Sequence, residues 1–522
     1  MSAEMRTSSA DARLRPPRWR SQEQWRSVDR KITLLVPVSL GLSLWYFEWL
    51  LRPSRVGNPI LYGLLVLAEL FNFFQAFGFW WTSWRGRGWH APELPCPEGL
   101  VVDVIIPVYS EPVEIVEPTV AAASAMRGAN VQVVLADDAG RAELEELARR
   151  HGARYVHRDE QRGAKAGNLN YVLRQTNAPL VAVFDCDHVP LPQFLEKTLG
   201  CLVDPRVAYV QTPQYYANSR SGRLAAAAAS QQVLFFGAIA RGKARLGAMF
   251  CCGTNVVFRR SALEEVGGFP EGSLTEDFAL SIHLHELGWK SAYVNEVLAL
   301  GLGPEDMASY VSQQQRWARG CLAALPMAIT ADLPFRLRMQ YVLSAMFFLS
   351  GWTFALYMAL PAIRIFVGIQ PLAGATANQF LVHFAPYFGM SLFAVALAGG
   401  GDYTFGAFAL LLANYFVQIL SSLLVLTRRR GRFVVTAKRG QQARQPQTVI
   451  PALLAILGLS AAIAYALDGR ISAGSLNNVA FATLHISVLL VGAWPALVGA
   501  SRARLRQEEE AIEPLAVLPE LA

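Results

Sequence analysis

Residues 180–190 read LVAVFDCDHVP, and this stretch decides which class of fold the chain can adopt. Five apolar residues run without a break into two acidic residues, Asp185 and Asp187, which are separated by one position. A short, continuous apolar run is typical of a strand that is covered on both faces of a sheet. We therefore expect a buried strand over residues 180–184 that ends in a pair of carboxylates.

The same pattern recurs along the middle of the chain. Further apolar runs occur at 101–108, 131–136, 153–156 and 207–211. Residues 141–151 (RAELEELARRH) instead show a helical period with balanced charge. Strands that alternate with helices predict a mostly parallel sheet, so we expect an α/β domain over residues 100–330.

Acidic residues at the strand ends are candidate binding residues, because such sheets bind ligands beyond the carboxyl ends of their strands. Asp137 and Asp138 directly follow the run at 131–136. One such aspartate could be only a turn residue, but two pairs at one edge favour a binding crevice. Residues 107–112 (PVYSEP) lack the GxGxxG pattern, and no phosphate loop ends in Gly-Lys-Ser/Thr. A dinucleotide dehydrogenase and a P-loop ATPase are therefore excluded.

The composition indicates an integral membrane protein with one large soluble part. Of the 522 residues, 53% are hydrophobic and only 17% are charged, against about 25% charged in soluble chains. The net charge of +7 does not indicate a nucleic-acid partner, because the basic residues cluster beside apolar segments. The six cysteines show no zinc-site spacing and are interpreted as reduced cytosolic thiols. Residues 1–30 precede a retained anchor rather than a cleaved signal peptide.

Six apolar stretches are long enough to cross a membrane. They lie at about 33–51, 60–83, 341–367, 379–399, 449–467 and 478–499. The arginine-rich segments before the first, between the fourth and fifth, and after the last should be cytoplasmic. Residues 405–427 are ambiguous: a seventh span would put the basic segment 428–444 outside, so we expect an interfacial or re-entrant segment.

These assignments divide the chain into four parts of a multi-pass protein of the cell (inner) membrane, with its soluble domain in the cytoplasm. Residues 1–99 hold a tail and two spans, and 100–330 form the soluble domain. Residues 331–506 hold interfacial helices, four spans and a loop at 428–444, and 507–522 form a short acidic tail. Glu48 and Glu69 lie inside apolar runs, where a carboxylate is a functional candidate.

Two acidic motifs suggest a site for metal-assisted group transfer. The carboxylates of Asp185 and Asp187 suit a hard divalent cation, Mg²⁺ or Mn²⁺, that neutralises a diphosphate leaving group. Glu276 and Asp277 precede a helical stretch at 278–287, where Asp277 could act as a general base. The alternative is that Thr275 caps this helix and the acids favour its dipole, and both roles can hold together.

A third motif, QQQRW at 313–317, indicates recognition of a sugar and a phosphate. Gln313, Arg316 and Trp317 share one face of a helix. The indole offers a flat apolar surface for a sugar ring, and the guanidinium can contact a diphosphate with paired donors. Lys165 could add positive charge near the phosphate. A packing tryptophan and an ordinary surface lysine are the alternatives.

With these motifs in this order, the chain resembles bacterial cellulose synthase and the wider processive family-2 glycosyltransferases. The resemblance runs from about 101 to 438 and includes DVIIPVYSEP (103–112), both aspartate pairs, KAGNLN (165–170), QTP (211–213), FCCGT (250–254), TED (275–277) and QQQRW (313–317). Residues 433–438 (FVVTAK) look like the family's gating loop, which enters the catalytic pocket over bound nucleotide.

The resemblance implies a GT-A-like fold and a role for each matching residue. It assigns uridine or diphosphate binding to Tyr109, Glu111, Asp137, Asp138, Lys165, Asp185 and Arg316. It assigns the metal to Asp185 and Asp187, catalysis to Asp277 and Glu276, and the acceptor to Trp317, Gln313 and Cys252. It assigns gating to Phe433, Val435, Thr436 and Lys438.

The implied reaction polymerises a UDP-sugar, foremost UDP-glucose, into a β-linked polysaccharide with inversion and extrudes it across the lipid bilayer. An extracytoplasmic accessory subunit is an implied partner. We expect no cyclic-di-GMP-binding barrel in the roughly 20 residues after the last span. Gln214, Tyr215 and Tyr216 replace the more usual His-Phe-Phe, and Ala139 replaces the usual glycine of Asp-Asp-Gly. These departures leave the sugar and the linkage open.

Three alternatives follow from the same residues. The same machinery could make a β-1,3- or mixed-linkage glucan, a mannan or a hyaluronan-like chain. A non-processive transferase acting on a lipid acceptor would not need the QQQRW motif or the gating loop. A membrane transporter would not need the carboxylate motifs of the soluble domain.

Overall fold

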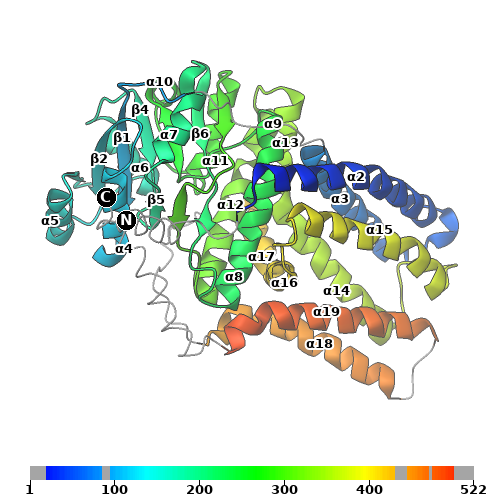
Figure 1. Ribbon diagram of the computed structural model, residues 1–522. Helices are drawn as coiled ribbons and strands as arrows, with labels where there is room; N and C mark the ends of the chain where they lie inside the picture. The colour runs from blue at the N-terminus through cyan, green and yellow to red at the C-terminus, as the bar shows by residue number, and fades with distance from the viewer. Residues whose placement is uncertain (1–18, 85–94, 429–443, 469–472, 499–522) are drawn as a thin grey trace, which may run out of the picture.

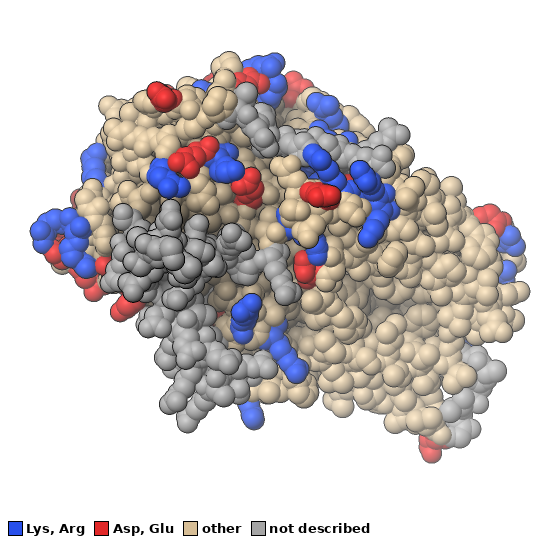
Figure 2. Space-filling model, viewed as in Figure 1, with Lys and Arg blue, Asp and Glu red and all other residues tan. Residues whose placement is uncertain are grey.

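The computed structural model describes residues 19–84, 95–428, 444–468 and 473–498. An α/β domain lies on one side of the molecule, and a group of long helices lies on the other (Figure 1). On the face drawn in Figure 2, the side with the long helices carries few charged side chains. The α/β domain is formed by the middle of the chain, whereas the long helices come from both sides of it in the sequence. This arrangement confirms the expected fold class.

The α/β domain is built on a seven-stranded sheet with the order β3-β2-β1-β4-β8-β6-β9. Its strands are β1 (Val101–Val108), β2 (Asn130–Asp137), β3 (Arg154–His157), β4 (Leu180–Val183), β6 (Val207–Gln211), β8 (Val256–Arg259) and β9 (Lys290–Tyr293). All five predicted strands are present to within one residue at each end. The sheet is parallel except for β8, which runs antiparallel to both of its neighbours.

Alternate residues of the central strands enter two separate cores, which explains why these strands are apolar at most positions. Val104 and Ile106 of β1 pack into one core, while Ile105 between them packs into the other. Helices cover both faces: α4 (Val113–Ser124), α5 (Ala142–Arg150) and α7 (Phe194–Thr198) lie on the first, and α6 (Ala164–Leu173), α10 (Arg260–Glu265) and α11 (Glu276–Glu286) lie on the second.

A second, three-stranded sheet lies beside the carboxyl end of β4. It has the order β5-β10-β7, with β5 (His188–Pro190), β10 (Ala299–Gly301) and β7 (Tyr215–Tyr216). Gly301 pairs with His188 on one side and with Tyr216 on the other. The three residues therefore form one row across this sheet.

Among the described residues, seven helical segments are long and apolar enough to cross a membrane. Six match the expected spans: α2 (Gln22–Leu50), α3 (Pro59–Ser83), α13 (Phe335–Met346) with η4 (Phe347–Leu349) and α14 (Ser350–Val367), α15 (Ala377–Ala398), η5 (Pro446–Val449) with α18 (Ile450–Leu467), and α19 (Ala473–Val498). Residues 405–427 form α16 (Phe405–Ala413) and α17 (Tyr415–Leu426), bent by 42°. This bend fits a broken span or a re-entrant segment.

The seventh segment, Arg223–Arg245, was not predicted. It consists of α8 (Arg223–Gln232), the π-helix η3 (Val233–Ala240) and α9 (Arg241–Arg245). Its strongly apolar part is only the π-helical stretch, and polar or alanine residues flank it, so hydropathy alone did not single it out. Half of it is buried inside the protein, and in Figure 1 α8 lies between the α/β domain and the long helices.

Buried polar contacts join this segment to α2. Arg241 and Asp29 form an ion pair at 2.6 Å, and each side chain is less than a tenth exposed. The Arg241 guanidinium also lies 5.2 Å from the centre of the Trp25 ring. A Cβ on Gly237 would come within 2.2 Å of the Trp25 ring, so only glycine permits this approach. The α/β domain is thus anchored directly on the first long helix.

Candidate active site

A cavity of about 310 Å³ opens where the carboxyl ends of β1 and β4 face α11 and α12 (Met307–Thr330). Most of the residues that the sequence singled out lie in its wall. They are Tyr109, Glu111, Asp138, Lys165, Asp185, Asp187, Cys252, Glu276, Asp277, Gln313, Arg316 and Trp317. Segments up to about 200 residues apart in the chain therefore meet at one site.

Asp185, Asp187 and His188 form a group that could hold a metal ion. One ligand atom from each residue lies within 4.8 Å of the others. Two carboxylates and an imidazole suit Mg²⁺ or Mn²⁺, with Mn²⁺ the better match to nitrogen. Lys165 Nζ lies 2.5 Å from Asp185 Oδ1 and donates to the Gly253 carbonyl at 2.8 Å, which brings a cation to the same place.

Sequence analysis missed His188, although it directly follows the aspartate pair. A lone histidine after an apolar strand carries no signal until its neighbours are known. In the small sheet His188 lies opposite Gly301, where a Cβ would come within 2.4 Å of the imidazole. The absence of a side chain at residue 301 gives the imidazole its place beside the carboxylates.

Asp277 lies in the first turn of α11 and lines the same cavity as the metal group. Burial, followed by the charge of Glu276, raises the pKa of its carboxyl from 3.8 to about 7, although Lys165 and Arg316 act in the opposite direction. A carboxyl with a pKa near neutrality is suited to take up a proton during a reaction. Thr275 is the N-cap residue, but its side chain makes no capping hydrogen bond.

Gly253 brings the backbone close to this carboxyl. Its φ is +80°, in the left-handed region that favours glycine. A Cβ there would lie 3.0 Å from Asp277 Oδ2 and 3.7 Å from Lys165 Nζ. A side chain at residue 253 would therefore strain the backbone and press against the Asp277 carboxylate.

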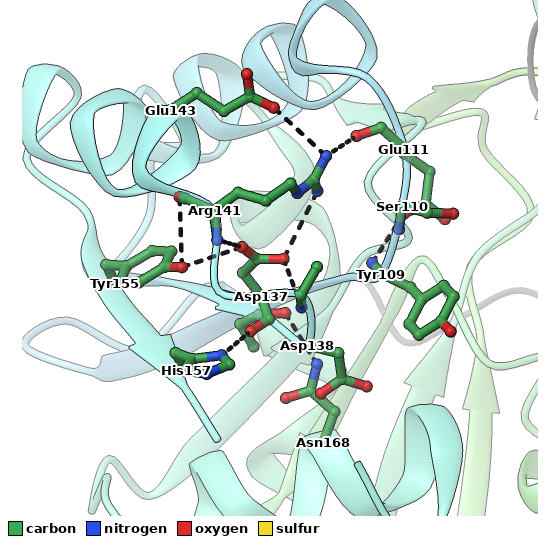
Figure 3. Close-up of polar contacts among 12 residues, drawn as sticks. Tyr109, Ser110, Glu111, Asp137, Asp138, Arg141, Glu143, Tyr155, His157 and Asn168 are labelled. Carbon is green, nitrogen blue, oxygen red and sulfur yellow. Dashed lines mark hydrogen bonds and ion pairs between the residues drawn. The ribbon is translucent and has the colours of Figure 1, made fainter. Parts of the chain in front are cut away.

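The two aspartates at the end of β2 have different surroundings (Figure 3). Asp137 does not line the cavity. Its carboxylate is fully buried and accepts hydrogen bonds from the Arg141 N–H at 2.7 Å, the Ala139 N–H at 3.1 Å and the Tyr155 hydroxyl at 3.0 Å. With these contacts Asp137 stabilises the turn after β2. This is the turn role that the sequence analysis gave as the alternative to binding.

Asp138 faces the cavity but is paired with Arg158 from the segment after β3. The guanidinium donates to both carboxylate oxygens, at 2.6 and 2.8 Å. Glu111 accepts from the backbone N–H groups of Tyr109 and Ser110 at 2.9 and 3.1 Å, which shapes the turn after β1. The Tyr109 side chain is 47% exposed beside this turn, so its ring could stack on a base.

The QQQRW motif lies on α12, as predicted. Asp306 caps this helix by accepting from the Ser309 N–H at 2.8 Å. Gln313, Arg316 and Trp317 all line the cavity. The predicted gating residues Phe433, Val435, Thr436 and Lys438 lie outside the described residues.

Comparison with known proteins agrees with this geometry. Residues 180–420 match glycosyl transferase family group 2. The chain is 30% identical over 487 residues to "Cellulose synthase 2" of Novacetimonas hansenii, covering 88% of this chain and 30% of that protein. It is 29% identical to "Cellulose synthase 1 catalytic subunit [UDP-forming]" of Komagataeibacter xylinus, over 83% of this chain and 62% of that one. This chain thus spans less than two thirds of either relative.

The fold has a solved counterpart. A mannosyltransferase from Pyrobaculum calidifontis, solved with GDP-Man and Mn²⁺, superposes with a TM-score of 0.51 at 19% identity and covers 71% of this chain and 99% of its own. At that identity the likeness concerns the fold alone. The sequence matches and the architecture together show that this chain is cellulose synthase-like, with residues 180–420 matching glycosyl transferase family group 2 and with a GT-A-like fold.

Proposed function

We propose that this chain is a processive, inverting glycosyltransferase that transfers the sugar of a UDP-sugar, foremost UDP-glucose, to a growing β-linked glycan. The observation that carries the proposal is the meeting, in one cavity, of a metal-binding group, a carboxyl with a near-neutral pKa and the Trp317 indole. These are the three parts that sugar transfer from a diphosphate needs.

Each part has a distinct role. Tyr109 and Asp138 would contact the uridine, and Arg316 and Lys165 would face the diphosphate. Asp185, Asp187 and His188 would hold Mg²⁺ or Mn²⁺, which neutralises the diphosphate as it leaves. Trp317 and Gln313 would hold the acceptor sugar, with Cys252 in the wall beside them.

Asp277 would take the proton of the attacking acceptor hydroxyl. As that oxygen bonds to the anomeric carbon, the bond from this carbon to the diphosphate breaks and UDP leaves with the electron pair. A single displacement of this kind inverts an α-linked donor to a β-linked product. Glu276, next to Asp277, helps to keep the carboxyl pKa high before substrate binds.

The long helices support coupling of synthesis to export across the inner membrane. The cavity wall formed by α12 continues into contacts with α13 and α17, so a chain leaving the site would enter the helical part. We propose that the α/β domain faces the cytoplasm, that residues 428–444 close over bound nucleotide, and that an accessory subunit on the other side receives the product.

Incubation of the purified full chain with radiolabelled UDP-glucose and Mg²⁺ or Mn²⁺ tests the proposal. We expect a polymer that a β-1,4-specific glucanase degrades, and we expect none from Asp277→Asn. Parallel reactions with UDP-N-acetylglucosamine and GDP-mannose identify a different polymer if the donor is not UDP-glucose. Transfer of a single sugar to lipid, with no polymer from any donor, would refute processive synthesis.

A further inference from the structure

Tyr216 occupies a polar position in the cavity wall that the proposed catalytic roles leave unexplained. Its side chain is only 3% exposed, yet it lines the cavity together with Gln313 and Trp317. Its phenolic hydroxyl is a buried polar group, so its hydrogen-bond partners matter for the shape of the wall.

Two glutamine side chains hold this hydroxyl. Gln313 of α12 and Gln232 of α8 each donate from Nε2 to the Tyr216 oxygen, both at 3.3 Å. The two donors occupy both acceptor positions of the hydroxyl oxygen. Since the donors come from different helices, Tyr216 links α12 to α8. In this arrangement the amide nitrogen of Gln313 faces Tyr216.

The amide oxygen of Gln313 is then the polar atom left for a ligand. Among the described residues it has no hydrogen-bond partner, and Gln313 is half-buried in the cavity wall one helical turn from Trp317. A carbonyl oxygen accepts hydrogen bonds and donates none, so it selects a ligand that offers an O–H. A sugar hydroxyl is such a group.

The small sheet sets the spacing between Tyr216 and His188 of the candidate metal group. Tyr216 and His188 pair with the same residue, Gly301, from opposite sides. Two strand spacings, about 10 Å, therefore separate their backbones, a distance that leaves room for a sugar ring. Gly303 leaves space for the Tyr216 ring, since a Cβ there would lie 2.6 Å from its Cδ2.

We propose that Tyr216 is a positioning residue for the acceptor saccharide, acting by fixing the Gln313 amide so that its oxygen accepts a hydrogen bond from a sugar hydroxyl. The inference rests on the proposed function and deepens it: it adds Tyr216 as the residue that orients Gln313 toward the acceptor saccharide. Gln232 supports the arrangement from the unpredicted segment Arg223–Arg245.

The test measures binding of cellotetraose to the purified full chain in the presence of UDP and Mg²⁺. Tyr216→Phe removes one hydroxyl and retains the ring, so the variant should fold. We expect cellotetraose affinity to fall about three- to ten-fold, the loss that one neutral hydrogen bond accounts for. UDP affinity should stay within two-fold. In transfer assays, the acceptor KM should rise while kcat stays within two-fold.

Tyr310→Phe is the matched control, because Tyr310 is a buried tyrosine of α12 that donates to Gln231 of α8 at 3.1 Å but does not line the cavity. It should leave cellotetraose binding unchanged. In a Gln313→Ala background, Tyr216→Phe should have no further effect, because its action passes through that amide.

Three results would overturn the inference: unchanged cellotetraose affinity in Tyr216→Phe, an equal loss in Tyr310→Phe, or an additive loss in the double variant. Absence of cellotetraose binding by the unaltered chain would overturn it as well. Normal cellotetraose binding without any transfer from a UDP-sugar would refute the proposed function and leave the acceptor subsite standing.

Discussion

Replacing Asp277 by asparagine should make this protein more stable and inactive at the same time. The carboxyl pKa rises from 3.8 to about 7 when the chain folds, because the cavity wall desolvates its charge. At pH 8 the Asp277 carboxyl is ionised in both states, but its ionisation costs more free energy in the folded protein than in the unfolded chain. The ionised carboxylate therefore lowers the stability of the folded protein. Asparagine fills nearly the same volume without that charge.

The size of the effect follows from the pKa difference. Each tenfold change in the ionisation constant corresponds to about 1.36 kcal/mol, which sets an upper limit of about 4 kcal/mol at pH 8. Asp277 keeps some exposure to the cavity, and solvent there screens part of the penalty, so we expect about 2 kcal/mol. The penalty is absent below about pH 4, grows as the pH rises toward 7 and is complete above 7.

Thermal unfolding of the purified protein at pH 5 and pH 8 measures this effect. The unfolding temperature of Asp277→Asn should exceed that of the unaltered chain by a few degrees at pH 8 and by less at pH 5. Glu264→Gln, an exposed change on α10, is the control and should shift neither value. Activity should fall by about 10²- to 10⁴-fold, as loss of a general base predicts, with UDP affinity within a few-fold.

The pH profile of the unaltered enzyme gives a second measure of the same group. A base must be deprotonated to act. Below about pH 7, kcat/KM should therefore fall about tenfold per pH unit, and above about pH 7 it should be constant. Equal unfolding temperatures for Asp277→Asn and the unaltered chain at pH 8, together with turnover near the unaltered rate, would refute the reasoning.

Three further outcomes are expected. Excess EDTA should stop synthesis and Mn²⁺ should restore it, with Asp187→Asn requiring more Mn²⁺ in a titration; full synthesis in EDTA would contradict the metal site. Gly253→Ala should lower kcat at least tenfold, because its Cβ would lie 3.0 Å from the Asp277 carboxylate; a rate within two-fold would show that the loop yields without cost. Lys438→Ala should reduce polymer yield strongly while Arg429→Ala does not, with membrane insertion equal by blot; equal losses would indicate lipid binding by the basic segment instead.

Local sequence patterns determined the α/β domain. Strands buried on both faces need apolar residues at nearly every position, so β1 and β6 could be located to the residue. The helical spacing of Gln313 and Trp317 on α12 is likewise a local property. Six long apolar segments were visible because a membrane span requires a minimum length of apolar chain.

Contacts between distant segments decided the rest. The sequence presents Asp137 and Asp138 as equivalent, and only their partners, the turn after β2 and Arg158, distinguish them. His188 and Tyr216 pair with a strand more than 80 residues further along the chain, where Gly301 and the following Gly303 leave them room. The sequence gives the chemistry of each side chain directly. Its neighbours depend on which distant strands pair, and a local sequence pattern does not determine that pairing.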